Sequence, residues 1–142
     1  MQIQRTVETS AAPAAVFTYL SDFTTTNEWD PGTVRTTRIS GDGGVGTTYR
    51  NVSSFLGRKT ELTYTVTGHE PDRLFALRGE NKSVVAHDTM EIAPHGSGTR
   101  VTYTAEFEFQ GVSKFVAPLL SPALKKLGDD AEEGLRTSLG RL

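Results

Sequence analysis

Hydrophobic and polar side chains alternate along most of this chain, which is the pattern of β-strands that bury one face. Residues 2–9 alternate in this way and are rich in β-branched side chains, so they predict a first strand. The same period later predicts six more strands, near residues 34–40, 46–55, 59–69, 73–80, 83–92 and 99–109. The breaks between them are short and rich in Gly, Pro, Asp and Asn, so we expect antiparallel hairpins in a meander.

Helical spacing replaces this alternation between the first two strands. Apolar residues follow Pro13 at intervals of three or four, which predicts a short helix with Ser10 as its N-cap. The next segment, residues 22–32, reads "DFTTTNEWDPG" and predicts a second short helix or turn.

The C-terminal tail predicts a long amphipathic helix that packs on the rest of the domain. Pro118 and Pro122 interrupt its first part, and Ser121 and Pro122 suit the N-cap and the first turn of a new helix. The tail is therefore either one kinked helix or two helices. Its apolar residues recur every three or four positions: Val112, Val116, Leu119, Leu120, Ala123, Leu127, Ala131, Leu135 and Leu139.

A glycine-rich stretch, residues 39–50 with the sequence "ISGDGGVGTTYR", contains the G-x-G-x-x-G spacing of a dinucleotide-binding loop. Such a loop needs a helix after its last glycine, so that the helix N-terminus faces the pyrophosphate. Here β-branched and aromatic residues follow Gly46, which is the composition of a strand. We therefore interpret the glycines as a hairpin loop in which positive φ angles are tolerated.

Composition describes a single domain, residues 1–142, with no broad electrostatic field. The net charge is −2 and cysteine is absent, so disulfides and thiolate metal sites are excluded. No apolar run approaches the roughly 20 residues that cross a bilayer, and the N-terminus lacks a signal-peptide pattern. We expect a cytoplasmic protein without stable membrane insertion. Five basic residues on nearby strands have acidic neighbours and no aromatic platform, so nucleic-acid binding is not predicted; they are Arg35, Arg38, Arg50, Arg58 and Lys59.

Three stretches of the chain carry a family resemblance. Residues 7–32, "VETSAAPAAVFTYLSDFTTTNEWDPG", hold an opening strand, a helix start and a tryptophan segment. Residues 44–77, "GVGTTYRNVSSFLGRKTELTYTVTGHEPDRLFAL", hold a Gly-Thr strand, a hairpin and a turn. Residues 90–109, "MEIAPHGSGTRVTYTAEFEF", hold a Gly-Thr-Arg entry to the last strand. In this order they resemble the START-like superfamily (SRPBCC), and within it the bacterial polyketide cyclase/dehydrase and lipid-transport family.

The resemblance implies an α+β helix-grip fold. In it, a seven-stranded curved antiparallel sheet wraps around a long C-terminal helix, with two short helices after the first strand. It also implies an elongated apolar cavity between sheet and helix. Members bind or carry lipids, sterols or polyketides, and some are cyclases or aromatases. The family has no universal catalytic motif, so no catalytic residue is carried over.

Strand alternation then predicts which side chains face that cavity. Large side chains on this face can instead fill the core and leave no space, because protein interiors are close-packed. Small or polar members such as Asn51, Ser53, Ala86 and Ala105 favour a lined pocket. Trp29 either covers one end of the cavity or anchors the short helices in the core. The predicted ligand-binding residues are Trp29, Tyr49, Asn51, Phe55, Tyr64, Phe75, Leu77, Asp88, Met90, Tyr103, Phe107, Phe115 and Leu119.

Asp88 is the most informative of these residues, because a buried carboxylate is costly without a partner. It shares the inward parity of Met90 and either faces the ligand space, with Tyr103, Tyr64 or an arginine, or is turned outward by a bulge. A cyclase needs an acid–base group inside an apolar pocket. Asp88, Tyr64 and Tyr103 are therefore the candidate catalytic residues.

Two further features bear on function. Alternate turns of a meander lie at one end, so Phe55, Leu56, Phe109 and Phe115 are expected to form an apolar rim, or else to pack as an ordinary end cap. The histidines have no metal-binding spacing, and we predict neither a metal nor a cofactor.

The leading hypothesis is binding or transport of an apolar small molecule such as a lipid, isoprenoid or polyketide. The alternatives are a polyketide cyclase/aromatase-type enzyme and a protein-interaction module that uses the rim. A monomer and a homodimer are both compatible with the sequence.

Overall fold

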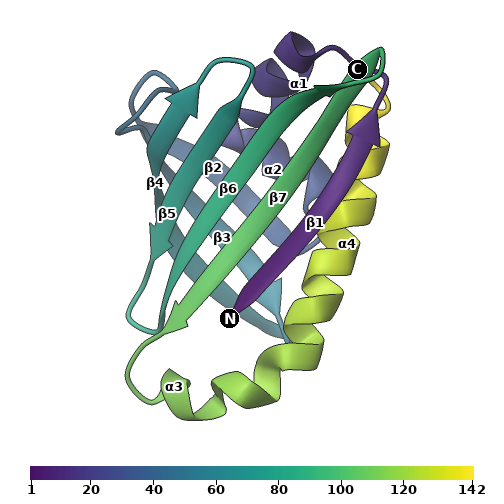
Figure 1. The fold of residues 1–142 in the computed structure, drawn as a ribbon. Coiled ribbons are helices and arrows are strands. Elements are labelled where there is room, and N and C mark those ends of the chain that lie inside the picture. The colour runs from purple at the N-terminus through teal and green to yellow at the C-terminus, as the bar shows by residue number, and fades with distance from the viewer.

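The structure, a computed structural model, describes residues 1–142. Seven strands are interrupted after the first by short helices and are followed by a helical tail (Figure 1). The elements are β1 (Gln2–Thr9), α1 (Pro13–Leu20), the 3₁₀ turn η1 (Phe23–Thr25), α2 (Thr26–Trp29), β2 (Thr33–Ser40), β3 (Thr48–Phe55), β4 (Arg58–Glu70), β5 (Leu74–Glu80), β6 (Val84–His95), β7 (Gly98–Phe109), α3 (Ser113–Val116), the 3₁₀ turn η2 (Ala117–Leu120) and α4 (Ser121–Leu139).

All seven strands form one antiparallel sheet in the order β1-β7-β6-β5-β4-β3-β2. Consecutive strands from β2 to β7 are neighbours, and β1 returns to pair with β7 along its whole length. Figure 1 shows the sheet curving around, with α4 running beside β1 and closing its open side. The predicted fold, a seven-stranded curved antiparallel sheet around a long C-terminal helix, is confirmed.

The short helices lie where the sequence predicts them, but their first cap differs. Helix α1 begins at Pro13, and Ala12 rather than Ser10 is its N-cap, with no side-chain cap bond. Proline suits the first helical position, because its missing N–H would have no partner within the helix and its fixed φ angle is already helical. In the next turn Asp22 does cap, because its carboxylate accepts a hydrogen bond from the Thr24 backbone N–H at 3.0 Å.

The glycine-rich stretch is a hairpin loop, as predicted. Strands β2 and β3 pair antiparallel on either side of it. Gly41, Gly43 and Gly46 have φ angles of 96°, 107° and 92°. These values belong to the left-handed side of the backbone map, which side chains disfavour and glycine accepts. The G-x-G-x-x-G spacing therefore serves a turn, and no helix follows it.

The tail follows one continuous helical path with a bend. Helix α3, the turn η2 and helix α4 succeed one another without a break, and Figure 1 shows the chain changing direction between α3 and α4. Leu120 is the N-cap of α4, so Ser121 is its first residue rather than its cap. Pro118 and Pro122 flank the bend, in agreement with the inability of proline to continue an α-helical hydrogen-bond ladder.

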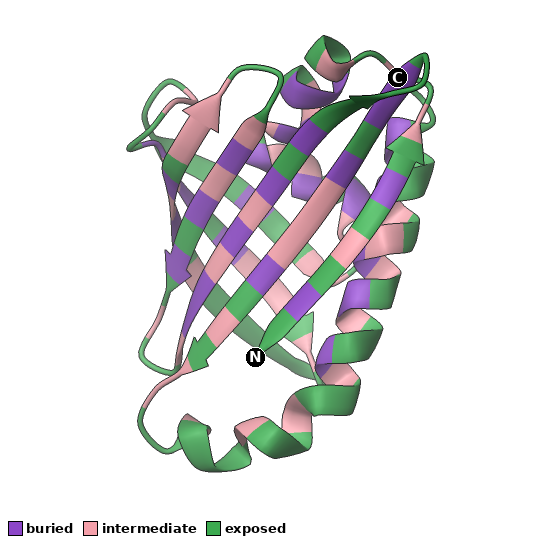
Figure 2. Ribbon diagram, in the orientation of Figure 1, coloured by how far each residue is buried: buried purple, intermediate pink, exposed green.

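The hydrophobic core occupies one half of the molecule. Figure 2 shows buried positions alternating along the strands, most densely toward the end that α1 and α2 cover. Trp29, Phe75, Leu77, Met90 and Leu135 are fully buried there. Toward α3 the strands and the helix are mostly intermediate or exposed. The core thus ends part-way along the sheet, and this leaves the other half for a cavity.

Candidate functional site

A cavity of about 270 Å³ lies between the concave face of the sheet and α4. Side chains from β1, β3, β4, β6, β7, α2 and α4 line it, and most of them are apolar. The lining also includes Ser83 and Val116, which are exposed, so the cavity reaches the surface near α3. Its volume is close to the lower end of the range for small-molecule pockets, roughly 300–1,000 Å³.

Small residues explain why this half is hollow. Ala105 on β7 and Ala131 on α4 line the cavity where larger side chains would fill it. Gly128 of α4 packs so closely on β1 that a Cβ there would lie 2.5 Å from Cγ2 of Ile3. Helix α4 therefore packs closely against β1 at Gly128, and the small side chains of the two alanines leave the cavity unfilled.

Asp88 is a buried carboxyl group in the wall of this cavity. It is 5% exposed, and the Tyr103 hydroxyl donates a hydrogen bond to its Oδ2 over 3.1 Å. Its Oδ1 has no hydrogen-bond partner in the protein. The strand register is regular here, because Asp88 pairs with Leu77 on one side and Ala105 on the other. No bulge turns the side chain outward, so Asp88 faces the cavity.

The environment of Asp88 favours its protonated form. Burial raises the pKa of Asp88 to about 7, the Tyr103 hydrogen bond opposes this rise, and the negative charge of Asp30 adds to it. No basic side chain lines the cavity to stabilise the carboxylate. A carboxyl group of this kind changes charge near neutral pH, which suits either proton transfer or the binding of a charged partner.

Asp30 is a second carboxyl group in the cavity wall, and sequence reasoning missed it. Its oxygens accept hydrogen bonds from the Gly32 backbone N–H at 3.0 Å and the Thr33 hydroxyl at 2.9 Å. Burial raises its pKa, and these two hydrogen bonds oppose the rise. The Asp-Pro-Gly sequence that contains it reads as an ordinary turn, and the loop folds inward because α2 packs against α4.

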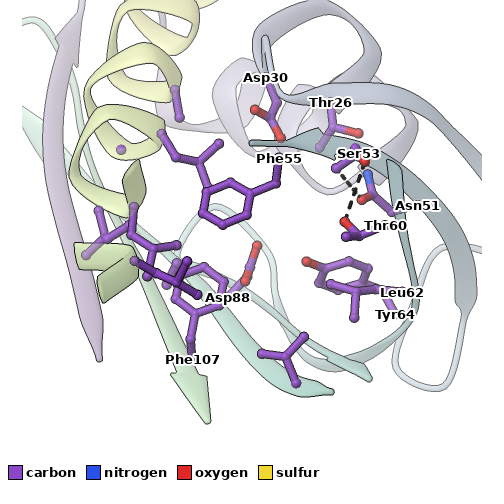
Figure 3. Close-up of a pocket in the computed structure, with 18 of the residues that line it drawn as sticks. Thr26, Asp30, Asn51, Ser53, Phe55, Thr60, Leu62, Tyr64, Asp88 and Phe107 are labelled. Atoms are coloured by element: carbon purple, nitrogen blue, oxygen red, sulfur yellow. Dashed lines mark hydrogen bonds between the residues drawn. The ribbon is translucent and has the colours of Figure 1, made fainter. Parts of the chain in front are cut away.

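Tyr64 on β4 contributes a hydroxyl that no protein group binds. Its side chain is 7% exposed, and its hydroxyl makes no hydrogen bond within the protein. Figure 3 shows this hydroxyl and the Asp88 carboxylate pointing into the same open space. Burial, followed by the negative charges of Asp88 and Asp30, raises the pKa of Tyr64 well above its usual value. The ring lies against Gly79, where a Cβ would be 2.7 Å from its Cε1 atom.

Asn51 lines the cavity, but its amide is used within the protein. Its Nδ2 donates to the hydroxyls of Thr33 and Thr36, and its Oδ1 accepts from the Ser53 hydroxyl at 2.7 Å. This network, whose Ser53 end is visible in Figure 3, ties β3 to β2. Asn51 therefore organises the wall, whereas Asp88 and Tyr64 present free polar atoms.

Seven of the predicted ligand-binding residues line the cavity. Trp29 combines the two roles that the sequence left open, because it is 2% exposed in the core and also lines the cavity, with its ring centroid 5.8 Å from that of Tyr103. The seven are Trp29, Asn51, Phe55, Tyr64, Asp88, Tyr103 and Phe107.

Four other predicted residues lie in the core instead of at the cavity: Tyr49, Phe75, Leu77 and Met90. Their inward parity is as predicted, but their side chains pack in the hydrophobic core and do not line the cavity. Tyr49, for example, packs against Phe23 with ring centroids 5.6 Å apart. Alternation identifies the face of a strand and not the position along it where helices cover that face.

Phe115 and Leu119 also lie outside the cavity, with exposed fractions of 82% and 78%. They belong to the bent first part of the tail, whose inward positions are occupied by Val116 and Leu120. Of the predicted rim, Phe55 and Phe109 line the cavity, whereas Leu56 is 65% exposed. The rim is thus apolar on both its inner and its outer surface.

His, Asp and Glu side chains form no group of three or more that could hold a metal ion. None of the helices has both the length and the apolar character required to cross a membrane.

Comparison with known proteins agrees with this architecture. Among solved structures, the ZhuI aromatase/cyclase from Streptomyces sp. R1128 is 14% identical, with a TM-score of 0.83 over 98% of this chain and 93% of that one. A Thermus thermophilus protein is 17% identical, with a TM-score of 0.81 over 98% and 97% of the two chains. A START superfamily protein from Mycobacterium smegmatis is 18% identical, with a TM-score of 0.71 over 97% and 93%. No curated protein matches the sequence.

These structural likenesses establish the fold alone, because all three sequence identities are below 25%. The sequence itself matches one family profile, described as polyketide cyclase/dehydrase and lipid transport, over residues 1–140. This match spans nearly the whole chain, from β1 to the end of α4. The protein therefore belongs to the polyketide cyclase/dehydrase and lipid transport family.

Proposed function

We propose that this protein binds an apolar small molecule in the cavity between the sheet and α4. The observation that carries the proposal is the cavity itself, which is largely apolar, is open near α3 and contains free polar atoms at Asp88 and Tyr64. Family membership supports the same class of role. A bound ligand would place its apolar part against residues such as Leu62, Phe107 and Leu124.

Burial of apolar surface supplies the affinity of such a complex, at about 25 cal/mol per Å² before the costs of ordering the ligand. The two free polar atoms orient the ligand. A ligand that displaces water from them without replacing its hydrogen bonds binds less tightly. This division between an apolar wall and a few directing groups is typical of small-molecule sites.

Filling the cavity tests the proposal. In Ala105→Phe, a phenyl ring replaces a buried methyl group in the wall. We expect wild-type protein to bind the neutral fluorescent probe N-phenyl-1-naphthylamine saturably, and the variant to bind it at least about tenfold more weakly. Ala93→Phe is the matched control, because Ala93 lies exposed on β6 and lines no part of the cavity.

Circular dichroism must show that both variants fold. No saturable binding by the wild-type protein would overturn the proposal. Equal binding by a folded Ala105→Phe variant would place the probe outside this cavity.

Acid–base catalysis is the second candidate function, and the Asp88–Tyr103 hydrogen bond favours it. A carboxyl group with a pKa of about 7 in an apolar cavity is suited to remove or return a proton at neutral pH. In a cyclisation of a poly-β-keto chain, Asp88 would act on the substrate and Tyr103 would hold its Oδ2. Equal turnover of such a substrate by wild-type protein and Asp88→Asn would exclude this role.

A further inference from the structure

The side chains of the cavity wall that can be charged at neutral pH are all acidic. Its wall contains two carboxyl groups, Asp30 and Asp88, and no lysine, arginine or histidine. Arg5 is on the inward face of β1, but its guanidinium group donates to the Asp129 carboxylate at 2.8 Å and to the Lys125 carbonyl. The inward-facing cation of this strand is therefore committed to α4 and is not available to the cavity.

Asp88 and Tyr64 are each more than nine-tenths buried, and each has an oxygen without a partner in the protein. Both oxygens point into the same space (Figure 3). A buried carboxylate normally has a cation or several donors beside it. Here Tyr103 supplies one donor, and the position opposite Oδ1 is left for a ligand.

We propose that the cavity selects apolar molecules that carry a protonated amine, with the ammonium group held by Asp88. This inference rests on the proposed binding function and names its ligand class. An ammonium group donates up to three hydrogen bonds, so it can bind Asp88 Oδ1 and also the Tyr64 hydroxyl oxygen. Hydrogen bonds between charged partners are the strongest of their kind.

The aromatic wall supports a cation and the charges oppose an anion. Trp29, Tyr64, Tyr103 and Phe107 line the cavity, and aromatic faces attract ammonium groups. A carboxylate ligand of the same length would instead meet two carboxyl groups in the cavity wall, with no cation to compensate. A fatty acid anion is therefore the ligand that this cavity disfavours most.

Three ligands that share one alkyl chain test the inference: decylamine, 1-decanol and decanoate. Each is titrated by displacement of N-phenyl-1-naphthylamine, at concentrations below those at which it forms micelles. At about pH 8 we expect decylamine to bind about tenfold or more tightly than decanol, and decanoate to bind most weakly. Asp88→Asn should bring decylamine to within about threefold of decanol, since it removes the charge.

The pH dependence gives a second readout. The titratable groups around Asp88 are Asp30, Tyr64 and Tyr103, while α4 presents only uncharged side chains such as Leu124 and Leu127. Asp88 loses its proton near pH 7, and an ammonium group binds the ionised form. The affinity for decylamine should therefore rise about tenfold between about pH 6 and about pH 8, while that for decanol stays nearly constant.

The outcomes separate the inference from the function beneath it. If decanol and decylamine bind equally well to both proteins, the ammonium preference is overturned and the apolar binding function stands. If decanoate binds most tightly, the charge argument is wrong. If none of the three ligands displaces the probe, the proposed function fails, and the inference fails with it.

Discussion

Replacing Asp88 by asparagine is expected to raise the free energy of unfolding at about pH 8, by up to about 4 kcal/mol. The folded protein holds the proton of this carboxyl group up to a pKa of about 7, against a usual value of 3.8. Above pH 7 the folded state must ionise a buried group that the unfolded chain ionises freely. Asparagine has nearly the same shape, can accept the Tyr103 hydrogen bond and carries no charge.

The size of this effect changes with pH in a defined way. Below about pH 3 the carboxyl group is protonated in both states, and wild type and variant should be similarly stable. Between about pH 4 and pH 7 the unfolded chain binds fewer protons than the folded protein, so Asp88 lowers wild-type stability as the pH rises. Asp30, whose pKa burial also raises, leaves a slope of the same sign in the variant.

Urea unfolding at several pH values measures both proteins. Glu91→Gln is the matched control, because Glu91 is exposed on the same strand and loses the same charge. We expect it to follow the wild-type curve to within about 0.5 kcal/mol. If wild type and Asp88→Asn change stability in parallel between about pH 4 and pH 8, Asp88 is not the buried acid that the structure describes.

The strands could be predicted because the alternation of hydrophobic and polar residues is a local pattern. The extent of the cavity could not be predicted from it. Asp88 and Met90 share a strand and a face, yet one lines the cavity and the other lies in the core. They are about 7 Å apart along the strand. What distinguishes them is the place where α1, α2 and α4 cover the sheet, which is set by contacts between segments distant in the sequence.

Asp30 also could not be predicted from the local sequence, although it does line the cavity. The residues Asp30, Pro31 and Gly32 have the composition of a surface turn, and nothing local indicates a carboxyl group that lines a cavity. The turn is drawn inward because α2 lies directly against α4. That contact depends on a glycine in α4 whose role is not visible in the amphipathic pattern of the helix.

Gly134→Ala is expected to lower the free energy of unfolding by about 3 kcal/mol or more. At an ordinary interior helix position the same substitution stabilises by up to about 1 kcal/mol, because alanine is the better helix former. At Gly134, however, a Cβ would lie 1.8 Å from the carbonyl oxygen of Trp29 and 2.8 Å from its carbonyl carbon. These are backbone atoms, so no side-chain rotation relieves the overlap.

Gly140→Ala is the control in the same helical segment. Gly140 is exposed with a φ of −68°, and an added Cβ would lie 3.2 Å from its nearest neighbour, the Arg136 carbonyl oxygen. The free energy of unfolding of Gly140→Ala should stay within about 1 kcal/mol of the wild-type value. A Gly134→Ala protein as stable as this control would show that α4 and α2 are not in contact at Trp29.

Gly134→Ala also connects the contact between α2 and α4 with the cavity. Trp29 and Ala131 both line the cavity, and Ala131 lies one helical turn before Gly134. Relieving the overlap requires α4 to move away from α2, which widens the space between these two residues. At a temperature where the variant still folds, we therefore expect weaker binding of N-phenyl-1-naphthylamine, because the apolar wall no longer closes around the probe. Gly140→Ala should bind it as wild type does.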